Sequence, residues 1–230
     1  MWPLVIPAAL LIYFVYVSLG WNFWVSVSDW EPYSLQASYG FGGFQWYAQM
    51  FSDSAFVQSL LNTLILFLII PACLIIGLGL ALLMDQSLKG TSLFRNLILL
   101  PYALSFVVTG TVWAWMYNPS NGIINSILRA IGLGSLAGTW HTSQSTVMVS
   151  IIVALVWQFS GYVALLFLAG IKSVPQNVIN AAKLDGAYSP RIYMRLVLPS
   201  LKGSLSSAIT VLAMFALRSF DFIWQLTGGG

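Results

Sequence analysis

The chain has 230 residues, of which 59% are apolar and only 7% are charged. An ordinary soluble domain carries about a quarter charged residues, so this composition excludes a soluble globular protein. The net charge of +3, from nine basic and six acidic residues, forms no continuous basic stripe, which argues against a nucleic-acid partner. The sequence therefore predicts a polytopic membrane protein in contact with lipid.

Five apolar segments are long enough to cross a hydrocarbon core of about 30 Å, which requires roughly 20 residues of helix. They cover about residues 3–27, 60–84, 97–117, 147–171 and 205–224. None alternates apolar and polar residues as a membrane β-strand does, so each is expected to be helical. The first segment has no basic residue before it and no small-residue cleavage site after it, which favours a retained span over a signal peptide. The predicted fold is an all-α helical membrane bundle, one transmembrane domain over residues 1–230.

Positive charges define the expected orientation of these spans. Seven of the nine basic residues fall in two links, between the second and third spans and between the fourth and fifth: Lys89, Arg95, Lys172, Lys183, Arg191, Arg195 and Lys202. Cytoplasmic links carry such an excess, so we expect a multi-pass protein of the cell membrane with a cytoplasmic N-terminus. Five spans would leave the Gly-rich end outside, and we expect that a sixth span is missing from this chain.

The link over residues 172–202 is long for a connection between adjacent helices. Pro175, Pro190 and Pro199 divide it, since each starts or stops a helix. Between the first two, apolar residues recur at helical spacing, and Gly186 is placed to end the helix. Such a short helix suits docking into the groove of a partner protein; the alternative is an amphipathic helix that rests on lipid.

The same link resembles the EAA loop of permease subunits of binding-protein-dependent ABC importers. That signature has Glu-Ala-Ala, three residues, Gly, nine residues, an aliphatic residue, one residue and Leu-Pro. Here Asn180, Ala181 and Ala182 are followed at matching spacing by Gly186, Leu196 and Leu198-Pro199. Asn180 stands where Glu is usual, so a charged contact from that position is lost, whereas Lys183 and Asp185 retain charge.

The resemblance extends over nearly the whole chain. Residues 94–101 and 113–125 resemble the two ends of the third span of sugar-type permeases, and Phe220-Asp221 with residues 226–230 is similar to the maltose-type first permease subunit. The resemblance implies the type I importer permease fold and a sugar or oligosaccharide as substrate. It also implies an extracellular solute-binding protein, a second and different permease, and two ATPase subunits that hold ATP and Mg²⁺. The chain itself would carry no catalytic residue, cofactor or metal, and its residues 180–183, 185 and 186 would couple transport to the ATPases.

Polar residues inside spans are costly and usually face a cavity or one another, so they mark a candidate solute path. In the fourth span, Trp157, Gln158 and Gly161 combine an aromatic face with a planar amide, as sugar sites do; helix packing is the alternative at Gly161. The fifth span contributes four further candidates, Phe215, Arg218, Ser219 and Asp221. Arg218 and Asp221 are three residues apart and would share one face of a continuous helix.

Other functions stay open on the sequence alone. A glycerol-phosphate-type ABC importer is the nearest alternative, since Arg218 is suited to pair with a phosphate. A secondary transporter acting alone would have internal repeats and intramembrane carboxylates, and a membrane enzyme would need a catalytic cluster. The sequence has a single His and no phosphate-binding Gly-x-x-x-x-Gly-Lys-Ser/Thr loop, so catalysis by this chain is not expected.

Overall fold

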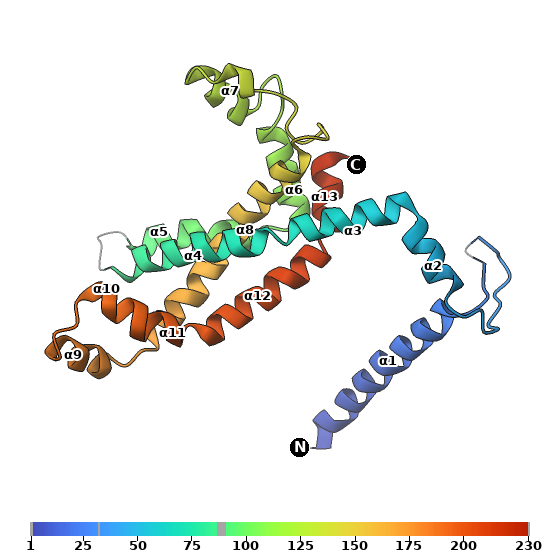
Figure 1. Ribbon diagram of the computed structural model, residues 1–230, viewed down its shortest axis with the longest axis horizontal. Helices are drawn as coiled ribbons and strands as arrows, with labels where there is room; N and C mark the ends of the chain where they lie inside the picture. The colour runs from blue at the N-terminus through green and yellow to red at the C-terminus, as the bar shows by residue number, and fades with distance from the viewer. Residues whose placement is uncertain (1, 32, 87–90, 230) are drawn as a thin grey trace. The chain divides into compact units, whose positions relative to one another are not determined.

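The computed structural model describes residues 2–31, 33–86 and 91–229. These residues are helical apart from turns and loops and one isolated antiparallel bridge between Ser28 and Phe41 (Figure 1). The predicted all-α class is therefore confirmed. The chain divides into two compact units, Met1–Leu61 and Asn62–Gly230, which are described separately.

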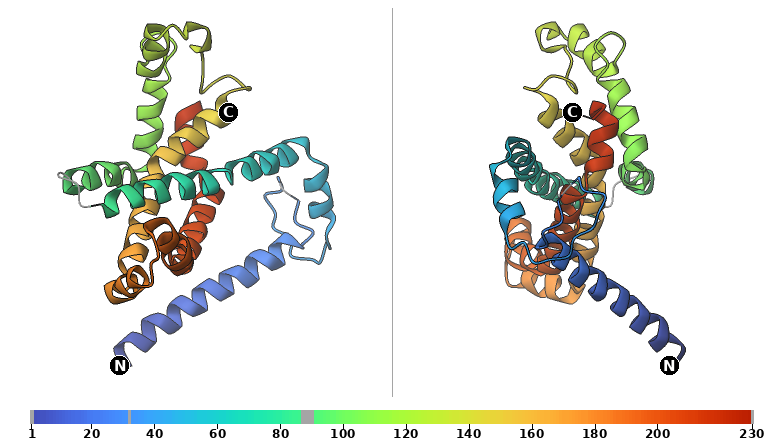
Figure 2. Two further views of the ribbon diagram at one scale, coloured as in Figure 1. Left: turned by 60° about the vertical axis from the view of Figure 1, so that its left-hand side comes forward. Right: turned by 90° about the vertical axis from the view of Figure 1, so that its right-hand side faces the viewer.

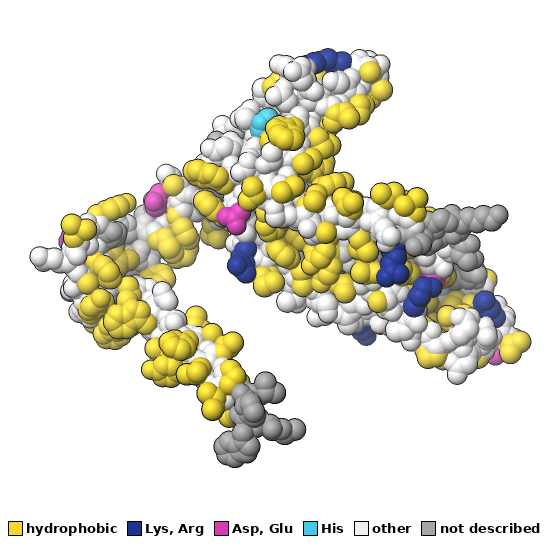
Figure 3. Space-filling view, turned by 180° about the vertical axis from the view of Figure 1, so that it is seen from behind, with side chains coloured by type: hydrophobic (Ala, Val, Ile, Leu, Met, Phe, Trp, Pro, Cys, Tyr) yellow, Lys and Arg dark blue, Asp and Glu magenta, His cyan; other side chains and the backbone are white. Residues whose placement is uncertain are grey.

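The first unit begins with helix α1, Trp2–Ser26, which is apolar throughout and exposed over most of its length. Figure 3 shows apolar side chains over the visible face of this helix. A helix that is apolar all round is stable only against lipid or other membrane helices. Helix α1 is therefore suited to a membrane span, and the stretch Val5–Ser26 is long and apolar enough to cross the bilayer.

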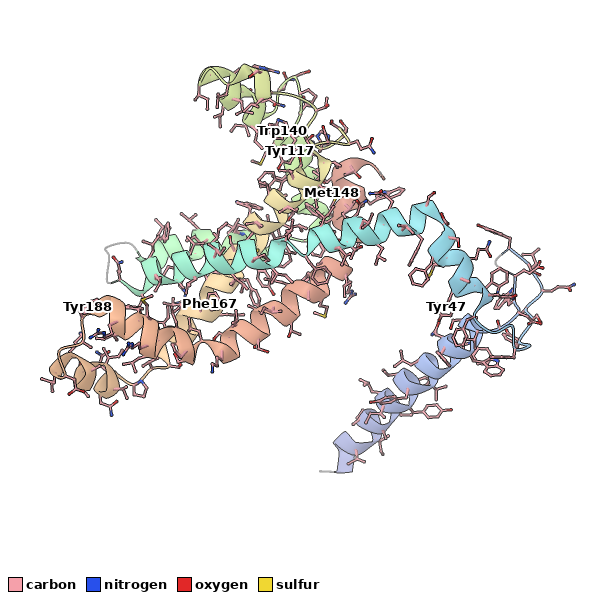
Figure 4. All side chains as sticks on the ribbon, viewed as in Figure 1. Tyr47, Tyr117, Trp140, Met148, Phe167 and Tyr188 are labelled. Atoms are coloured by element: carbon pink, nitrogen blue, oxygen red, sulfur yellow. The ribbon has the colours of Figure 1, made fainter. Side chains whose placement is uncertain are left out.

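The loop after α1 is held against that helix and against α2, Gln45–Ser52, by hydrogen bonds. The Asp29 amide donates to the Gly40 carbonyl at 2.9 Å. The Trp46 indole Nε1 donates to the Ser28 carbonyl at 3.0 Å, and the Tyr47 hydroxyl donates to Ser26 Oγ at 2.8 Å (Figure 4). Helix α3, Ser54–Leu66, follows. The loop is thus an ordered cap on one end of α1.

The second unit is built around α8, Val147–Lys172, whose buried residues run along most of its length. Helix α4, Ile69–Asp85, packs beside α8, and α12, Lys202–Leu217, packs against both (Figures 1 and 2). Phe167 of α8 lies in this core (Figure 4). Three helices in the described residues can cross a membrane, and five spans result if each of two bent helix pairs counts as one span.

The segment predicted to span over residues 97–117 is sharply bent. It consists of α5, Thr91–Leu99, the 3₁₀ turn Leu100–Ala103 and α6, Phe106–Met116, with 102° between its two halves. Leu104 is extended, and Ser105 caps α6 by accepting a hydrogen bond from the Val108 amide at 3.3 Å. Ser105 therefore begins a second helix in a new direction. The apolar run had predicted one continuous span and did not indicate this bend.

The segment predicted over residues 205–224 also differs. Helix α12 ends at Leu217, and a separate helix α13, Phe220–Thr227, packs against α6.

Before α12 come α9, Gln176–Leu184, α10, Ser189–Ile192, a π-helical turn, Tyr193–Val197, and α11, Leu198–Ser200. The stretch Tyr193–Ser200 meets α12 at 51°. Pro199 has no amide hydrogen, so the preceding helix cannot continue with regular bonding.

A small subdomain at the far end of α6 contains α7, Ile123–Ala130, and the 3₁₀ turn Gly134–Leu136. Its centre is the fully buried Asn125, whose side chain bonds the carbonyls of Tyr117, Asn118 and Gly138, the Gly138 amide and Trp140 Nε1 at 2.9–3.2 Å. The rings of Tyr117 and Trp140 stack at 6.4 Å between centroids (Figure 4). One amide side chain thus organises this region.

Candidate functional site

Helix α9 places the predicted coupling residues at the surface of the second unit. Pro175 is the N-cap residue, with φ −61° and ψ 133°; its fixed φ suits this extended conformation, and the helix begins at Gln176. No side chain of α9 is buried, and Leu184 is 90% exposed. Helix α9 therefore lies at the surface of the second unit, with an apolar side chain at its end fully outward.

The end of α9 has a defined cap. Gly186 has φ +78°, the left-handed conformation that glycine adopts without steric cost. Its amide donates to the Lys183 carbonyl at 3.1 Å, and the Ala187 amide donates to the Ala182 carbonyl at 2.9 Å. This pair of bonds is the Schellman motif. The glycine of the EAA signature therefore ends the helix and turns the chain towards α10.

The two sides of α9 face different surroundings. Gln176, Ile179 and Lys183 line a cavity of about 560 Å³ towards the end of α8 and the π-helical turn. The opposite side, at helical spacing, carries Val178, Ala181 and Leu184, all exposed. The remaining predicted coupling residues are distributed as follows: Asn180 accepts a hydrogen bond from Gln176 at 3.2 Å, Ala182 is half-buried, and Asp185 is exposed. The outward side is thus a small apolar surface.

A second cavity, of about 320 Å³, lies where the bend before α6 meets α8 and α12. It is lined by Tyr102, Leu104, Ser105, Phe106, Gln158, Phe159 and Phe215. Gln158 is only 3% exposed; its Nε2 donates to the Leu104 carbonyl at 3.0 Å, while its Oε1 has no hydrogen-bond partner among the described residues. Gln158 therefore lines this cavity with an amide whose buried oxygen is unpaired.

Aromatic rings form the rest of this cavity wall. The rings of Phe159 and Phe215 lie 4.8 Å apart between centroids, and Phe106 approaches Phe215 edge-on at 5.4 Å. Gln158 and Phe215, predicted on two different spans, are therefore brought together. The opening of the cavity by the bend at Leu104 was not predictable from either span.

The structure places the other predicted solute-path residues elsewhere. Trp157 is 39% exposed, with its ring edge-on to Trp113 at 5.7 Å. Gly161 packs against the backbone of Ile98, where a Cβ would lie 2.0 Å from the carbonyl oxygen. This close approach is the helix-packing role that the sequence left as the alternative.

Three more predicted residues gather at the junction of α12 and α13. Ser219 is buried and donates to the Ala216 carbonyl at 3.1 Å, whereas Arg218 and Asp221 are exposed. The expected common helix face does not form, because α12 ends before Arg218, whose φ of −113° departs from helical geometry. Arg218 and Asp221 make no ion pair; the ion pair found among the described residues joins Lys172 to Asp85 at 3.1 Å.

Sequence reasoning missed three residues that help to shape these sites. Tyr102 and Phe159 complete the aromatic cavity, and Asp85 at the end of α4 bonds to Lys172 and Tyr193, which lie before and after α9 in the chain. Tyr102 follows Pro101, a signal for a break, but its neighbours in space are remote in sequence. Asp85 lies one residue beyond the second predicted span, 60–84, and its two partners are remote in sequence.

Comparison with known proteins is consistent with this geometry. Residues 74–230 match the family model of the binding-protein-dependent transport system inner membrane component. A probable ABC transporter permease protein of Pyrococcus horikoshii is 45% identical over 227 residues, which cover 98% of this chain and 77% of that protein. The xylose/arabinose import permease protein of Haloferax volcanii is 38% identical, covering 97% of this chain and 70% of the relative.

The fold is also that of a solved transporter. A chain of a bacterial ABC transporter involved in the import of the acidic polysaccharide alginate superposes with a TM-score of 0.77 at 21% identity, covering 97% of this chain and 77% of that one. At this level of identity the match concerns the fold. The family match covers more than half of the sequence. The chain belongs to the family of binding-protein-dependent transport system inner membrane components, the permease subunits of ABC importers.

Proposed function

We propose that this permease subunit carries a sugar or oligosaccharide through the membrane, as one half of the translocation path of an ATP-driven importer. The observation that carries the proposal is the cavity lined by Gln158 and Phe215. Aromatic faces pack against the apolar faces of sugar rings, and an amide oxygen accepts from their hydroxyls. We assign the acceptor role to Gln158, a lining residue whose buried Oε1 has no partner among the described residues.

A neutral ligand fits this cavity better than an anion. Its lining contains no Lys, Arg or His, and its polar groups are one amide, one serine hydroxyl, one tyrosine hydroxyl and backbone. A buried phosphate needs charge-assisted partners, and Arg218, suggested for that role by the sequence, is not part of the lining. Glycerol phosphate therefore becomes the second candidate and an outcome of the test below.

The partners follow from the exposed coupling surface, here defined as Val178, Ala181 and Leu184 of α9. We propose that an ATPase subunit covers this surface and that two such subunits bind ATP and Mg²⁺, while this chain performs no catalysis. A second, different permease completes the path, and an extracellular solute-binding protein delivers the sugar. In this arrangement α9 and the N-terminus are cytoplasmic, in agreement with the basic residues of the 172–202 link.

The test begins with purification of the chain from its native membrane in gentle detergent, with mass spectrometry of the proteins that accompany it. An ATPase and a second permease are the expected companions. The complex and its binding protein are then placed in liposomes, and uptake of labelled neutral sugars and of glycerol phosphate is measured with and without ATP. Recovery of the chain alone would refute the proposal and favour a secondary transporter, and ATP-driven uptake of glycerol phosphate alone would refute the sugar assignment.

The coupling role is tested at Gly186. Gly186→Trp is expected to leave the protein in the membrane but to abolish ATP-driven uptake, because a bulky residue is added beside the coupling surface and L residues are strained by about 1–2 kcal/mol at positive φ. Gly203→Trp is the matched control: a Cβ there has no neighbour within 4 Å, and no positive φ constrains the backbone. Normal uptake by Gly186→Trp would show that this loop does not transmit the ATPase motion.

A further inference from the structure

Within the 172–202 link, residues 173–192 contain α9 and are called the coupling loop below; they are bordered on both sides by partners of one carboxylate. Lys172 is the last residue of α8, before the loop, and Tyr193 begins the π-helical turn after it. Lys172 Nζ lies 3.1 Å from Asp85 Oδ1, and the Tyr193 hydroxyl donates to Asp85 Oδ2 at 2.7 Å. Asp85 itself ends α4, so a single side chain joins three helical elements.

The cavity beneath α9 makes this connection mechanically important. The cavity of about 560 Å³ separates Ile179 and Lys183 from the end of α8 and the π-helical turn. Closely packed side chains transmit displacement, whereas a gap of this size lets one surface move without the other. On the cavity side of α9, a displacement of this helix can therefore reach the spans through the two ends of the coupling loop. Asp85 bonds to the residue at each of these ends.

We infer that Asp85 is a positioning residue that locks both ends of the coupling loop to α4, so that displacement of α9 by an ATPase moves α4 and α8 together. This inference rests on the proposed function for its ATPase partner. The two oxygens of the carboxylate have separate tasks: Oδ1 holds the end of α8, and Oδ2 holds the π-helical turn that leads to α12. Hydrogen bonds to a charged acceptor are stronger than neutral ones, which suits a connection that must stay formed while α9 is displaced.

Loss of Asp85 should loosen the loop without unfolding the protein. The Lys172 side chain is 61% exposed, so removal of its partner leaves a cation in water rather than a buried charge, while the Asp85 side chain is 18% exposed. Tyr193 is half-buried, so its hydroxyl remains within reach of water. We therefore expect a complex that assembles but in which displacement of α9 moves the spans less, so that less solute is taken up per ATP hydrolysed.

The experiment compares four variants of the complete complex in liposomes: Asp85→Ala, Lys172→Met, Tyr193→Phe and the control Lys202→Met. Lys202 is likewise exposed at a helix end, and the structure shows it in no ion pair. Solute uptake per ATP hydrolysed is measured beside the yield of assembled complex. Asp85→Ala should lower this ratio about fivefold or more, the range typical of coupling between sites; the two partner variants should lower it less and the control should not.

Hydrogen exchange provides a measurement that does not depend on transport. Asp85→Ala should speed amide exchange over residues 176–186 and leave residues 150–165, in the middle of α8, unchanged. Unchanged exchange in the loop, an unaltered uptake-to-ATP ratio in an assembled Asp85→Ala complex, or an equal loss in Lys202→Met would each overturn the inference. If Asp85→Ala fails to assemble, Tyr193→Phe decides by the same two measurements. A wild-type complex without ATP-driven uptake would refute the proposed function and leave the exchange measurement to judge Asp85.

Discussion

Replacement of Gly161 by Ala tests how closely α8 approaches the chain before the bend. A Cβ at residue 161 would lie 2.0 Å from the carbonyl oxygen of Ile98 and 2.9 Å from its carbonyl carbon. Carbon and oxygen atoms in such contacts are normally separated by roughly 3.3 Å or more. The obstacle is backbone, which cannot rotate away as a side chain does, so the two helices must move apart by about 1 Å.

The energetic cost follows from the overpacking that this separation relieves. Forcing an extra carbon into a well-packed site costs about 1–3 kcal/mol, and the separation also disturbs the adjacent stack of Tyr102 on Tyr162, at 4.6 Å between ring centroids. Alanine is more favourable than glycine in a helix interior, and this difference offsets about 0.5–1 kcal/mol of the cost. A net loss of about 1 kcal/mol corresponds to a fall in Tm of roughly 2–4 °C for a chain of this size.

The assay is thermal unfolding of the purified complex, followed by the fraction that remains soluble and assembled on size-exclusion chromatography. Gly79→Ala is the matched control, because a Cβ at that position in α4 has no neighbour within 4 Å. The control should leave Tm unchanged or raise it slightly. Equal Tm values for the two variants would refute the close contact between α8 and Ile98.

Two further predictions concern the subdomain around α7. Asn125→Ala removes five hydrogen bonds from a fully buried site, at a cost of about 1–3 kcal/mol for each buried group left unpaired. The loss should loosen α7 and let trypsin cleave after the exposed Arg129. Asn121→Ala, at an exposed residue, should not have this effect, and resistance of both variants would contradict the role of Asn125. Burial lowers the pKa of His141, so the unfolded state binds more protons and stability should fall as the pH drops through about 6.5. His141→Phe should weaken the dependence of Tm on pH between 7.5 and 5, and an identical dependence in the variant would show that another group titrates.

Much of this protein follows from local features of its sequence. An apolar run of about 20 residues must be helical in a bilayer whatever its neighbours are, so the class of the fold was predictable from composition and segment length. The turn at Gly186 was likewise predictable, since a glycine after an amphipathic helix favours a left-handed cap. The resemblance of the 172–202 link to the EAA loop, carried by the spacing from Ala181 to Pro199, likewise depends on residues that are neighbours along the chain.

The sites depend instead on contacts between distant segments. Gln158 bonds a carbonyl 54 residues away, and Asp85 bonds partners 87 and 108 residues away. The direction of α6 after Ser105 determines which side chains line the aromatic cavity, and the end of α12 before Arg218 removes a helix face that the spacing predicted. Helical periodicity describes one segment at a time, whereas a cavity or a connection between loop ends exists only after the segments have packed. Sequence alone therefore determined the helical membrane class and the glycine cap after α9, and tertiary structure decided which residues act together.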